Sequence, residues 1–416
     1  MPKSRKMKQI VFVNRFFYPD ESATAQILTD LAVYLGKQDY RVDIITSRLS
    51  YADPNTRYAS FDRLENVNIH RLPTTGFGRA GLIGRAVDYL SFYIASCLAV
   101  LKIVGAGSVL VVKTDPPLLS VPVGLAGRLK GAIRINWLQD LFPEVATELD
   151  VKLPLLGLVT YLRDRSLRQA KMNIVIGDRM AVRVGQLGVA ADRIGVIHNF
   201  ADDVALSISA DGADELRMQW GLSTTDFVIG YSGNLGRAHD FDTVLDAARR
   251  LRNHKSIKFL FVGGGHLRRE VELQREAHNL TNLIFKPYQP RQALARSLSL
   301  PDVHWISLRP EMEGLIVPSK LYGITAVGRG VIMIGDDEGE IGRLIKRHGF
   351  GVSVATGAGV ALADLVLQLS NDRAKCQKMA AKARHFTEHY GSRQLAFAQW
   401  RNHIAQLMET KSAGNS

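Results

Sequence analysis

The feature that most limits how this chain can fold is a recurrence of short, unbroken apolar runs, each followed by a helical pattern. Because these runs do not alternate with polar residues, they indicate strands covered on both faces, which is typical of parallel sheets between helices. The runs form two series: 9–14, 42–47, 108–113, 133–138 and 173–178, then 227–233, 257–265, 283–288, 303–308 and 330–336. We therefore predict an α/β chain with two Rossmann-like domains, each a doubly wound parallel sheet.

The length supports two domains, because 416 residues exceed what one hydrophobic core usually holds. We predict domains at 1–200 and 201–390, joined through the polar, Asp-rich segment 196–222, with a C-terminal segment at 391–416. The charged or small-residue ends, 1–8 and 409–416, are expected to be disordered.

The composition, with 46% hydrophobic and 22% charged residues, is that of a globular protein. Cys97 and Cys376 form no CxxC pair, which favours a reducing, cytoplasmic location over a disulfide framework. Asn14 and Arg15 break the apolar run near the N-terminus, so we expect no signal peptide. The net charge of +13 fits nucleic acid, an anionic membrane or an anionic small molecule, and the lack of a nucleic-acid module favours the last two.

Two segments bear on membrane contact. The apolar segment 86–107 contains Asp88 and Lys102, so we predict a buried or membrane-grazing helix rather than a transmembrane span. The segment 158–171 combines apolar residues with four basic ones, which are Arg163, Arg165, Arg168 and Lys171. Such a helix either lies on anionic lipid, here the inner face of the plasma membrane, or presents a solvated face.

Polar turns follow most of the predicted strands, and ligands of open parallel sheets bind beyond the carboxyl ends of the strands. We therefore expect the turns of two facing sheets to line one cleft. Gly233 begins a tight turn whose free N–H groups suit a phosphate, with Arg237 and His239 adding charge. The turn at Gly264 is similar. A plain strand-to-helix turn and close packing are the alternatives, because neither turn is a GxGxxG or Walker A motif.

The stretch 309–330 concentrates polar residues between two predicted strands. Pro318 suits the first turn of a helix, and Ser319 and Lys320 then lie at its N-terminus, where a lysine is unfavourable unless a phosphate lies nearby. Upstream, Glu311 and Glu313 are placed to accept hydrogen bonds from sugar hydroxyls. The alternative interpretation is a solvated acidic loop.

In the first series, Arg15 and Phe16 follow the first strand, where an acceptor can stack or pair. Asp115 precedes two prolines, and Asp140 and Glu144 follow the strand at 133–138. Helix capping and substrate contact are both open for these carboxylates. The sequence contains no GxSxG, HExxH or cysteine nucleophile and no clear metal-ligand spacing, so we expect a metal-independent mechanism.

Taken in order, these turns resemble those of bacterial family 4 glycosyltransferases, in the branch that builds O-antigens, capsules and exopolysaccharides. The resemblance rests on FYPDESATAQILTDLAVYL, DPPLLSVPVGL, WLQDLFPEVA, GYSGNLGRAHDFDTVLDAA, FVGGG and EGLIVPSKLYGITAVGRGVIMIG, which together span nearly the whole chain. It implies the GT-B fold, with an acceptor in the N-terminal domain, a nucleotide-sugar in the C-terminal domain and a final helix crossing back. It also implies transfer with retention, without a metal or another cofactor.

The residues and the resemblance together give three groups of candidates. The catalytic group is Glu313, Lys320 and Arg237. The group that holds the nucleotide-sugar is Gly233, Asn234, His239, Gly264, Gly314, Ser319 and Tyr322. The acceptor group is Arg15, Phe16, Asp115, Asp140 and Glu144. The chain departs from the family at Gly323, where a ribose-binding glutamate is usual.

The resulting hypothesis is a glycosyltransferase that moves a sugar from a nucleotide-diphosphate sugar, with UDP preferred over GDP, to a lipid-linked saccharide. Its further partner is an anionic membrane surface, and no nucleic acid is expected. Two rival hypotheses are a hydrolysing UDP-sugar epimerase of the same fold and a non-catalytic basic scaffold on a membrane or nucleic acid. Consumption of donor without acceptor distinguishes the first rival, and absence of nucleotide protection against unfolding distinguishes the second.

Overall fold

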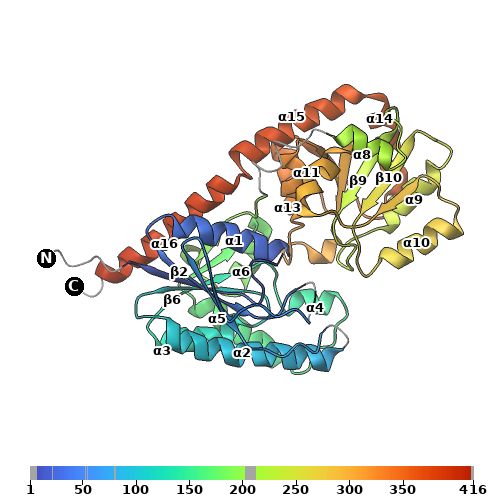
Figure 1. Cartoon of the computed structure of the whole chain (residues 1–416). Coiled ribbons are helices and arrows are strands. Elements are labelled where there is room, and N and C mark those ends of the chain that lie inside the picture. Colours follow the sequence, from blue (N-terminus) through green and yellow to red (C-terminus); the bar gives the residue numbers. More distant parts are fainter. Residues whose placement is uncertain are drawn as a thin grey trace. The chain divides into compact units, whose positions relative to one another are not determined.

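The structure is a computed structural model that describes residues 7–20, 22–51, 53, 55–78, 81–201 and 212–413. The chain divides into two compact units, one formed by Met1–His198 with Phe397–Ser416 and the other by Asn199–Ala396 (Figure 1). These divisions lie near the boundaries predicted at 200 and 390. The middle of the expected linker, 202–211, and the outer parts of the ends expected to be disordered lie outside the described residues.

The first unit is built on an eight-stranded sheet with the order β3-β4-β2-β1-β5-β6-β7-β8. Its strands are β1 Gln9–Val13, β2 Arg41–Ser47, β3 Phe61–Leu64, β4 Val67–Leu72, β5 Val109–Lys113, β6 Ile133–Trp137, β7 Met172–Val175 and β8 Ile194–Val196. All neighbours are parallel except β3, which runs antiparallel to β4 at one edge. The five predicted strands are confirmed. The sequence missed β3, β4 and β8, because β3 is polar and mostly exposed, β4 alternates buried and half-buried residues, and β8 is only three residues long.

Helices cover both faces of this sheet (Figure 1). On one face lie α1 Ala23–Gly36 and α16 Arg393–Ala413, and on the other α2 Leu82–Ile103, α3 Ser120–Leu129 and α5 Leu156–Gln169. The remaining elements are α4 Glu144–Glu148, α6 Asp178–Gln186 and the 3-10 turn η1 Ala191–Arg193. The Ser22 side chain caps α1 by accepting from the N–H of Ala25, which explains why this helix begins where it does.

The C-terminal helix α16 completes the core of the first unit. Trp400 is fully buried, and its ring centroid lies 4.6 Å from that of Trp137 on β6. Phe397 stacks on Tyr34 of α1 with 4.7 Å between centroids. The last segment of the chain therefore packs on strands and helices from its first half, which makes the two ends interdependent in folding.

Helix α2 is packed on the sheet along one side only. Phe92 and Val100 are fully buried in a cluster with residues of β1, β2 and β5. Among the described residues, α2 is the one helix that is long and apolar enough to cross a membrane, over Ile83–Ile103. Only 28% of its most apolar stretch is buried, so much of this apolar helix is in contact with solvent.

The second unit contains a six-stranded, fully parallel sheet with the order β11-β10-β9-β12-β13-β14. Its strands are β9 Phe227–Ser232, β10 Ile257–Val262, β11 Leu283–Lys286, β12 Val303–Ser307, β13 Gly330–Ile334 and β14 Gly351–Val354. The five predicted strands are confirmed, and the short edge strand β14 was missed. Its helices are α8 Ala213–Gln219, α9 Asp242–Arg250, α10 Arg268–Ala277, α11 Arg291–Ser299, α12 Lys320–Ala326, α13 Glu340–His348, α14 Gly359–Asn371 and α15 Arg373–His389, with the 3-10 turn η2 Pro310–Met312.

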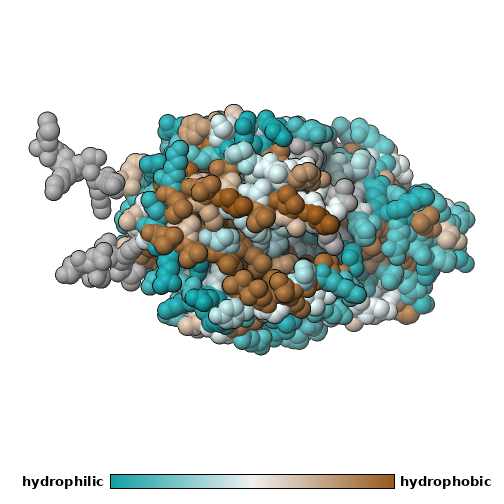
Figure 2. Space-filling model, turned by 90° about the horizontal axis from the view of Figure 1, so that it is seen from below, coloured by the Kyte–Doolittle hydropathy of each residue, from teal (hydrophilic) through white to brown (hydrophobic). Residues whose placement is uncertain are grey.

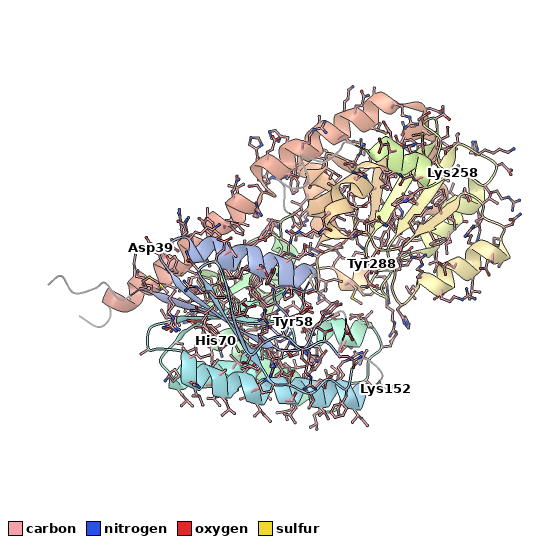
Figure 3. All side chains as sticks on the ribbon, viewed as in Figure 1. Asp39, Tyr58, His70, Lys152, Lys258 and Tyr288 are labelled. Carbon is pink, nitrogen blue, oxygen red and sulfur yellow. The ribbon has the colours of Figure 1, made fainter. Side chains whose placement is uncertain are left out.

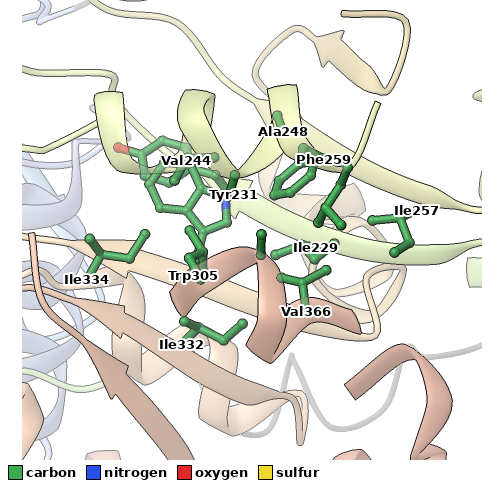
Figure 4. Packing of buried hydrophobic residues seen from close by; sticks show 14 of the residues in the cluster. Ile229, Tyr231, Val244, Ala248, Ile257, Phe259, Trp305, Ile332, Ile334 and Val366 are labelled. Atoms are coloured by element: carbon green, nitrogen blue, oxygen red, sulfur yellow. The ribbon is translucent and has the colours of Figure 1, made fainter. Parts of the chain in front are cut away.

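Aromatic rings form the centre of the second unit. Tyr231 of β9 and Trp305 of β12 lie 4.5 Å apart between centroids, and Val244 and Ala248 of α9 cover them (Figure 4). The Tyr231 hydroxyl lies at the edge of this cluster in Figure 4 and donates to the carbonyl of Asn234 over 2.6 Å. One core residue therefore reaches the turn that follows its own strand.

Replacing Trp400 by alanine should destabilise the first unit by about 3–5 kcal/mol, because a fully buried indole is lost from its contact with Trp137. Urea unfolding followed by circular dichroism measures the change. Asn402→Ala, at an exposed position of the same helix, should change the free energy of unfolding by less than about 0.5 kcal/mol. Equal stability of the two variants would contradict the packing described for α16.

Candidate functional site

Two glycine turns lie side by side at the carboxyl ends of β9 and β10. The N–H of Gly233 donates to the carbonyl of Val262 over 2.9 Å, and that of Leu235 donates to the carbonyl of Gly264 over 2.7 Å. Gly263 has a φ of 135°, and a Cβ at this position would lie 2.1 Å from the Gly233 carbonyl oxygen. The turns are therefore joined directly through their backbones, with no side chain between them at this point.

The side chain of Lys320, the first residue of α12, reaches this pair of turns. Its Nζ donates to the Tyr231 hydroxyl over 2.7 Å and lies 3.2 Å from His239 Nε2. The ammonium also lies 4.2 Å from the centroid of the Tyr231 ring. A Cβ on Gly233 would approach Lys320 Cε to 3.0 Å, so this glycine makes room for the lysine. The structure thus brings together Gly233, His239 and Lys320, three residues that were predicted to belong to one site.

The protonation of this cluster follows from its burial. Burial lowers the pKa of Lys320 to about 7, and within the described ranges the lysine forms no ion pair with a carboxylate. Burial and the nearby Lys320 lower the pKa of His239 to about 3, so its imidazole is neutral at physiological pH. His239 Nδ1 donates to the Ser307 carbonyl over 2.5 Å, which leaves Nε2 to accept from Lys320. An anion beside Lys320 would favour its charged form.

Other predicted residues lie on the segments that hold this lysine. Asn234 and Arg237 are exposed on the turn after β9, and Ser319 is exposed directly before α12. Tyr288 was not among the predicted residues. It is exposed, follows β11 and donates from its hydroxyl to the carbonyl of Gly264 over 3.2 Å (Figure 3). The sequence feature that could have indicated Tyr288 is an aromatic residue in a proline-flanked turn after a strand.

Two further predicted residues, Glu313 and Tyr322, are buried in the second unit. Glu313 is buried and its Oε2 accepts from the N–H of Glu340 over 3.0 Å, so its carboxylate lies at the start of α13. Gly314 follows it with a φ of 74°. Tyr322 is fully buried, its ring lies beside Gly391, and burial raises the pKa of its hydroxyl. The roles predicted for Glu313 and Tyr322 at the nucleotide-sugar stay predictions.

In the first unit, the predicted acceptor residues Arg15, Phe16 and Asp115 line one cavity of about 290 Å³. The Arg15 guanidinium lies 5.2 Å from the ring centroid of Phe16 and 5.3 Å from that of Tyr89. Tyr51 packs edge-on against Phe16 at 5.1 Å. Aromatic rings beside a guanidinium and a carboxylate suit a ligand with both apolar faces and hydroxyl groups.

Helix α2 contributes a buried carboxylate to this cavity that the sequence analysis did not assign to a site. Asp88 lies 3.5 Å from Arg15 in an ion pair. It also accepts from the Thr75 hydroxyl over 2.8 Å and from the N–H groups of Phe77 and Gly78. In the sequence, Asp88 stands out as a charged residue inside an apolar segment. We interpreted it there only as an argument against a membrane span.

A second buried cation lies at the carboxyl end of β5. Lys113 donates to the Thr24 carbonyl over 3.0 Å and lies 4.0 Å from the ring centroid of Trp137. Burial lowers the pKa of Lys113 to about 7, raises that of Asp140 to about 6, and also raises that of Asp115. No side chain caps the start of α3 or α4. The interpretation of Asp115 and Asp140 as helix caps is therefore wrong.

Glu144 is engaged in a two-point ion pair with Arg163 of α5. Its Oε2 accepts from Arg163 Nη1 over 2.7 Å, and its Oε1 accepts from Nη2. Arg163 is buried and also pairs with Asp164 over 2.7 Å. Arg163 therefore does not belong to an exposed basic face of α5, contrary to the prediction, and the carboxylate of Glu144 already has a cationic partner.

The two units thus offer different chemistry. The second presents an ammonium beside two glycine turns, which suits a phosphate, although the N–H groups of Gly233 and Leu235 already donate to the carbonyls of Val262 and Gly264 and are not free as predicted. The first presents aromatic rings, a guanidinium and carboxylates. Across the described residues, no group of three or more His, Cys, Asp or Glu side chains is placed to hold a metal ion.

The sequences of known proteins match part of this chain. Residues 212–386 match a family model described as glycosyl transferases group 1. WcaI of Escherichia coli K12, named as a glycosyl transferase of colanic acid biosynthesis, is 29% identical over 240 residues, which are 56% of this chain and 58% of WcaI. WbjE of Pseudomonas aeruginosa, named as a glycosyltransferase, is 30% identical over 139 residues, 33% of this chain and 34% of WbjE. The matches therefore span 58% and 34% of the lengths of these relatives.

Solved structures match over nearly the whole chain. Sucrose-phosphate synthase from Thermosynechococcus elongatus has a TM-score of 0.78 at 16% identity, covering 97% of this chain and 100% of that one. HepE of Anabaena in complex with UDP-glucose has a TM-score of 0.70 at 14% identity, covering 97% and 99%. WaaG, a glycosyltransferase of lipopolysaccharide biosynthesis, has a TM-score of 0.68 at 12% identity, covering 96% and 99%. Residues 212–386 therefore match the glycosyl transferases group 1 model, and the chain has the GT-B fold of these solved structures.

Proposed function

We propose that this chain is a glycosyltransferase that moves a sugar from a nucleotide-diphosphate sugar to a saccharide during assembly of a surface polysaccharide. The group 1 region and the names of WcaI and WbjE support the reaction class. The HepE structures, solved with UDP and with UDP-glucose, support UDP as the nucleotide. The proposal includes a lipid-linked acceptor and a retaining, metal-independent transfer in the cytoplasm.

The single observation that carries the proposal is the Lys320 ammonium, which faces Tyr231 and His239 without a carboxylate ion pair in the described part of the chain. A diphosphate would supply the missing negative charge. Gly233 has no side chain to keep a phosphate oxygen from the backbone, and the exposed Arg237 lies on the same turn. These groups form the donor site that we propose.

The chemistry asked of this site is stabilisation of a leaving diphosphate. The acceptor hydroxyl forms a new bond to the anomeric carbon while the bond from that carbon to the phosphate oxygen breaks, and the diphosphate takes the electron pair. The acceptor proton passes to the departing phosphate oxygen on the same face of the sugar, which gives retention without an enzyme nucleophile. Lys320 is already in position when the negative charge grows, so little reorganisation is needed during the reaction.

The cavity of the first unit is the acceptor site in this proposal. Phe16, Tyr51 and Tyr89 provide ring faces for a saccharide, and Arg15 with Asp115 provides hydrogen-bonding groups. This pairing of rings and charges matches a polar acceptor with apolar sugar faces better than it matches a second nucleotide, because Arg15 is already paired with Asp88.

Lys320→Met should lower kcat/KM by about 10²-fold or more, because a charged donor to the leaving group is lost. Thermal shifts with UDP, GDP and their sugars first select the donor, since a ligand that binds the folded state raises the melting temperature. Lys255→Met is the matched control, because Lys255 is exposed and precedes β10 at the end opposite to the Gly263 turn. Normal turnover of a folded Lys320→Met protein would refute the donor site.

The epimerase hypothesis is tested with the same donor in the absence of acceptor. A hydrolysing epimerase would consume it rapidly, whereas the proposed transferase would consume it only slowly. Rapid consumption without acceptor would replace the transferase proposal while leaving the donor site in place.

Affinity for UDP should fall as the pH rises above 7, by up to about tenfold per unit for a single linked proton. The sign follows from Lys320, whose lowered pKa of about 7 means that the ammonium is lost as the pH rises through that value, whereas a bound diphosphate favours the charged form. Titration calorimetry between pH 7 and 9 measures the slope. Lys320→Arg should flatten it, because a guanidinium keeps its charge. Equal slopes in the two proteins would count against the role of Lys320.

Tyr51→Ala should raise the KM for the acceptor by about two- to tenfold, the size of a lost aromatic contact, and leave UDP binding unchanged. Tyr18→Ala is the matched control, because Tyr18 is 44% exposed and Tyr51 is 42% exposed, but Tyr18 does not line the cavity. Steady-state kinetics with a lipid-linked acceptor fraction separates KM from kcat. A similar KM in both variants would argue against this cavity as the acceptor site.

A further inference from the structure

Helix α2 carries its large aliphatic side chains on the outside of the first unit. The exposed positions follow helical spacing and form one stripe: Ile83, Val87, Leu90, Ile94, Leu98 and Leu101. Ile83 is 83% exposed and Leu98 is 64% exposed. A soluble helix usually turns such a stripe toward the core, so an exposed stripe of this length marks an interaction surface.

Two polar residues of α2 lie on its inner side. Asp88 and Ser96 are buried, next to Phe92 and Val100 in the core. Asp88 is held by hydrogen bonds from residues 75–78 and by the ion pair with Arg15. The helix is thus anchored in the unit through Asp88, Phe92 and Val100, and this arrangement would be lost if α2 left the sheet to span a bilayer.

The apolar surface continues over the neighbouring helices. Leu125 and Leu129 of α3 are exposed, the latter by 73%, and Leu158 and Tyr161 of α5 are exposed as well. α3 contacts both α2 and α5, so the three helices form one continuous layer. Figure 2 shows hydrophobic side chains gathered on this side of the first unit.

The charges on this layer have one sign. Every exposed charged residue of α2, α3 and α5 is basic: Arg85, Lys102, Arg128, Arg165 and Arg168. The acidic residues of these helices are Asp88, which is buried, and Asp164, which is paired with Arg163. Lys152, labelled in Figure 3, adds an exposed cation just before α5. Basic side chains around an apolar stripe complement an anionic lipid surface.

We propose that the α2–α3–α5 face, defined by the exposed apolar residues of these helices, docks on the surface of an anionic lipid bilayer, with α2 lying in the plane of the interface. The aliphatic stripe enters the headgroup and acyl boundary, and the arginines and lysines contact lipid phosphates. Charge selects this occupant over a second copy of the chain, because two such faces would bring like charges together. The inference rests on the first unit alone and does not depend on the donor chemistry.

The test is co-sedimentation of the full chain with vesicles of phosphatidylcholine alone or mixed with phosphatidylglycerol in equal parts. The chain should bind the mixed vesicles and bind them less at high salt. The combined variant Leu90→Gln, Ile94→Gln and Leu98→Gln should bind at least about tenfold less, because its changes remove aliphatic surface at exposed positions. The control variant Met218→Gln, Leu273→Gln and Val360→Gln changes three exposed apolar residues of the second unit and should bind like the parent.

A second variant tests the charges separately. Arg128→Gln with Arg165→Gln should reduce the preference for phosphatidylglycerol while keeping the apolar stripe. The thermal shift with UDP, measured on every variant, reports whether the protein is folded and whether the donor site is intact. A normal thermal shift with UDP but no vesicle binding would refute only the docking proposal. A lost thermal shift with UDP but normal vesicle binding would refute only the donor site.

Three results would overturn the docking proposal. The first is a parent chain that ignores the mixed vesicles, and the second is a stripe variant that binds them as well as the parent does. The third is a dimer in analytical ultracentrifugation that the stripe variant dissociates, because the face would then be covered by a second copy. Extraction of cell membranes with alkaline carbonate separates docking, which is reversed, from a span, which is not.

Discussion

A half-buried ammonium that has no carboxylate partner among the described residues is the constraint on which the site of the second unit depends. Moving a charge out of water is unfavourable unless it is paired and hydrogen-bonded, and the lowered pKa of Lys320 records that cost. The Tyr231 hydroxyl and the His239 imidazole are both neutral acceptors, so they orient the ammonium without cancelling its charge. A cation held in this way is prepared for an anionic ligand before the ligand arrives.

The position of this cation is set by the hydrophobic core as much as by loops. Tyr231 packs against Trp305 in the centre of the second unit and is fully buried, while its hydroxyl meets both Lys320 and the carbonyl of Asn234. His239 is fixed through the carbonyl of Ser307 at the end of β12. The cation is thus held by contacts to two strands of the sheet, and groups that are positioned before a ligand binds need little reorganisation.

In the first unit, helix α2 contributes residues to two different surfaces. The inner side of α2 places Asp88 and Tyr89 at the cavity that we propose for the acceptor, and its outer side carries the aliphatic stripe that we propose for lipid. For a lipid-linked saccharide, this arrangement would hold the sugar part close to the bilayer that carries its lipid part.

The strands, the glycine turns and the presence of Lys320 at a helix start were predictable from sequence, because each depends on local pattern. Unbroken apolar runs indicate buried strands wherever they occur, and Gly233 or Pro318 acts on the backbone of its own segment. The exceptions were short or polar strands such as β3, β8 and β14, whose patterns are too weak to stand out.

Which polar residues meet was decided only by the tertiary structure. Lys320 finds Tyr231 and His239 across sequence separations of 89 and 81 residues, and no local pattern specifies those pairs. The same is true of Arg163, which turns inward to Glu144 instead of outward with Arg165. A sequence shows that a helix has an apolar side and a polar side, but the packing of its neighbours determines which side faces the sheet. For α2 that packing buries Asp88 together with Phe92 and Val100 and leaves an aliphatic stripe exposed, which the apolar pattern by itself does not predict.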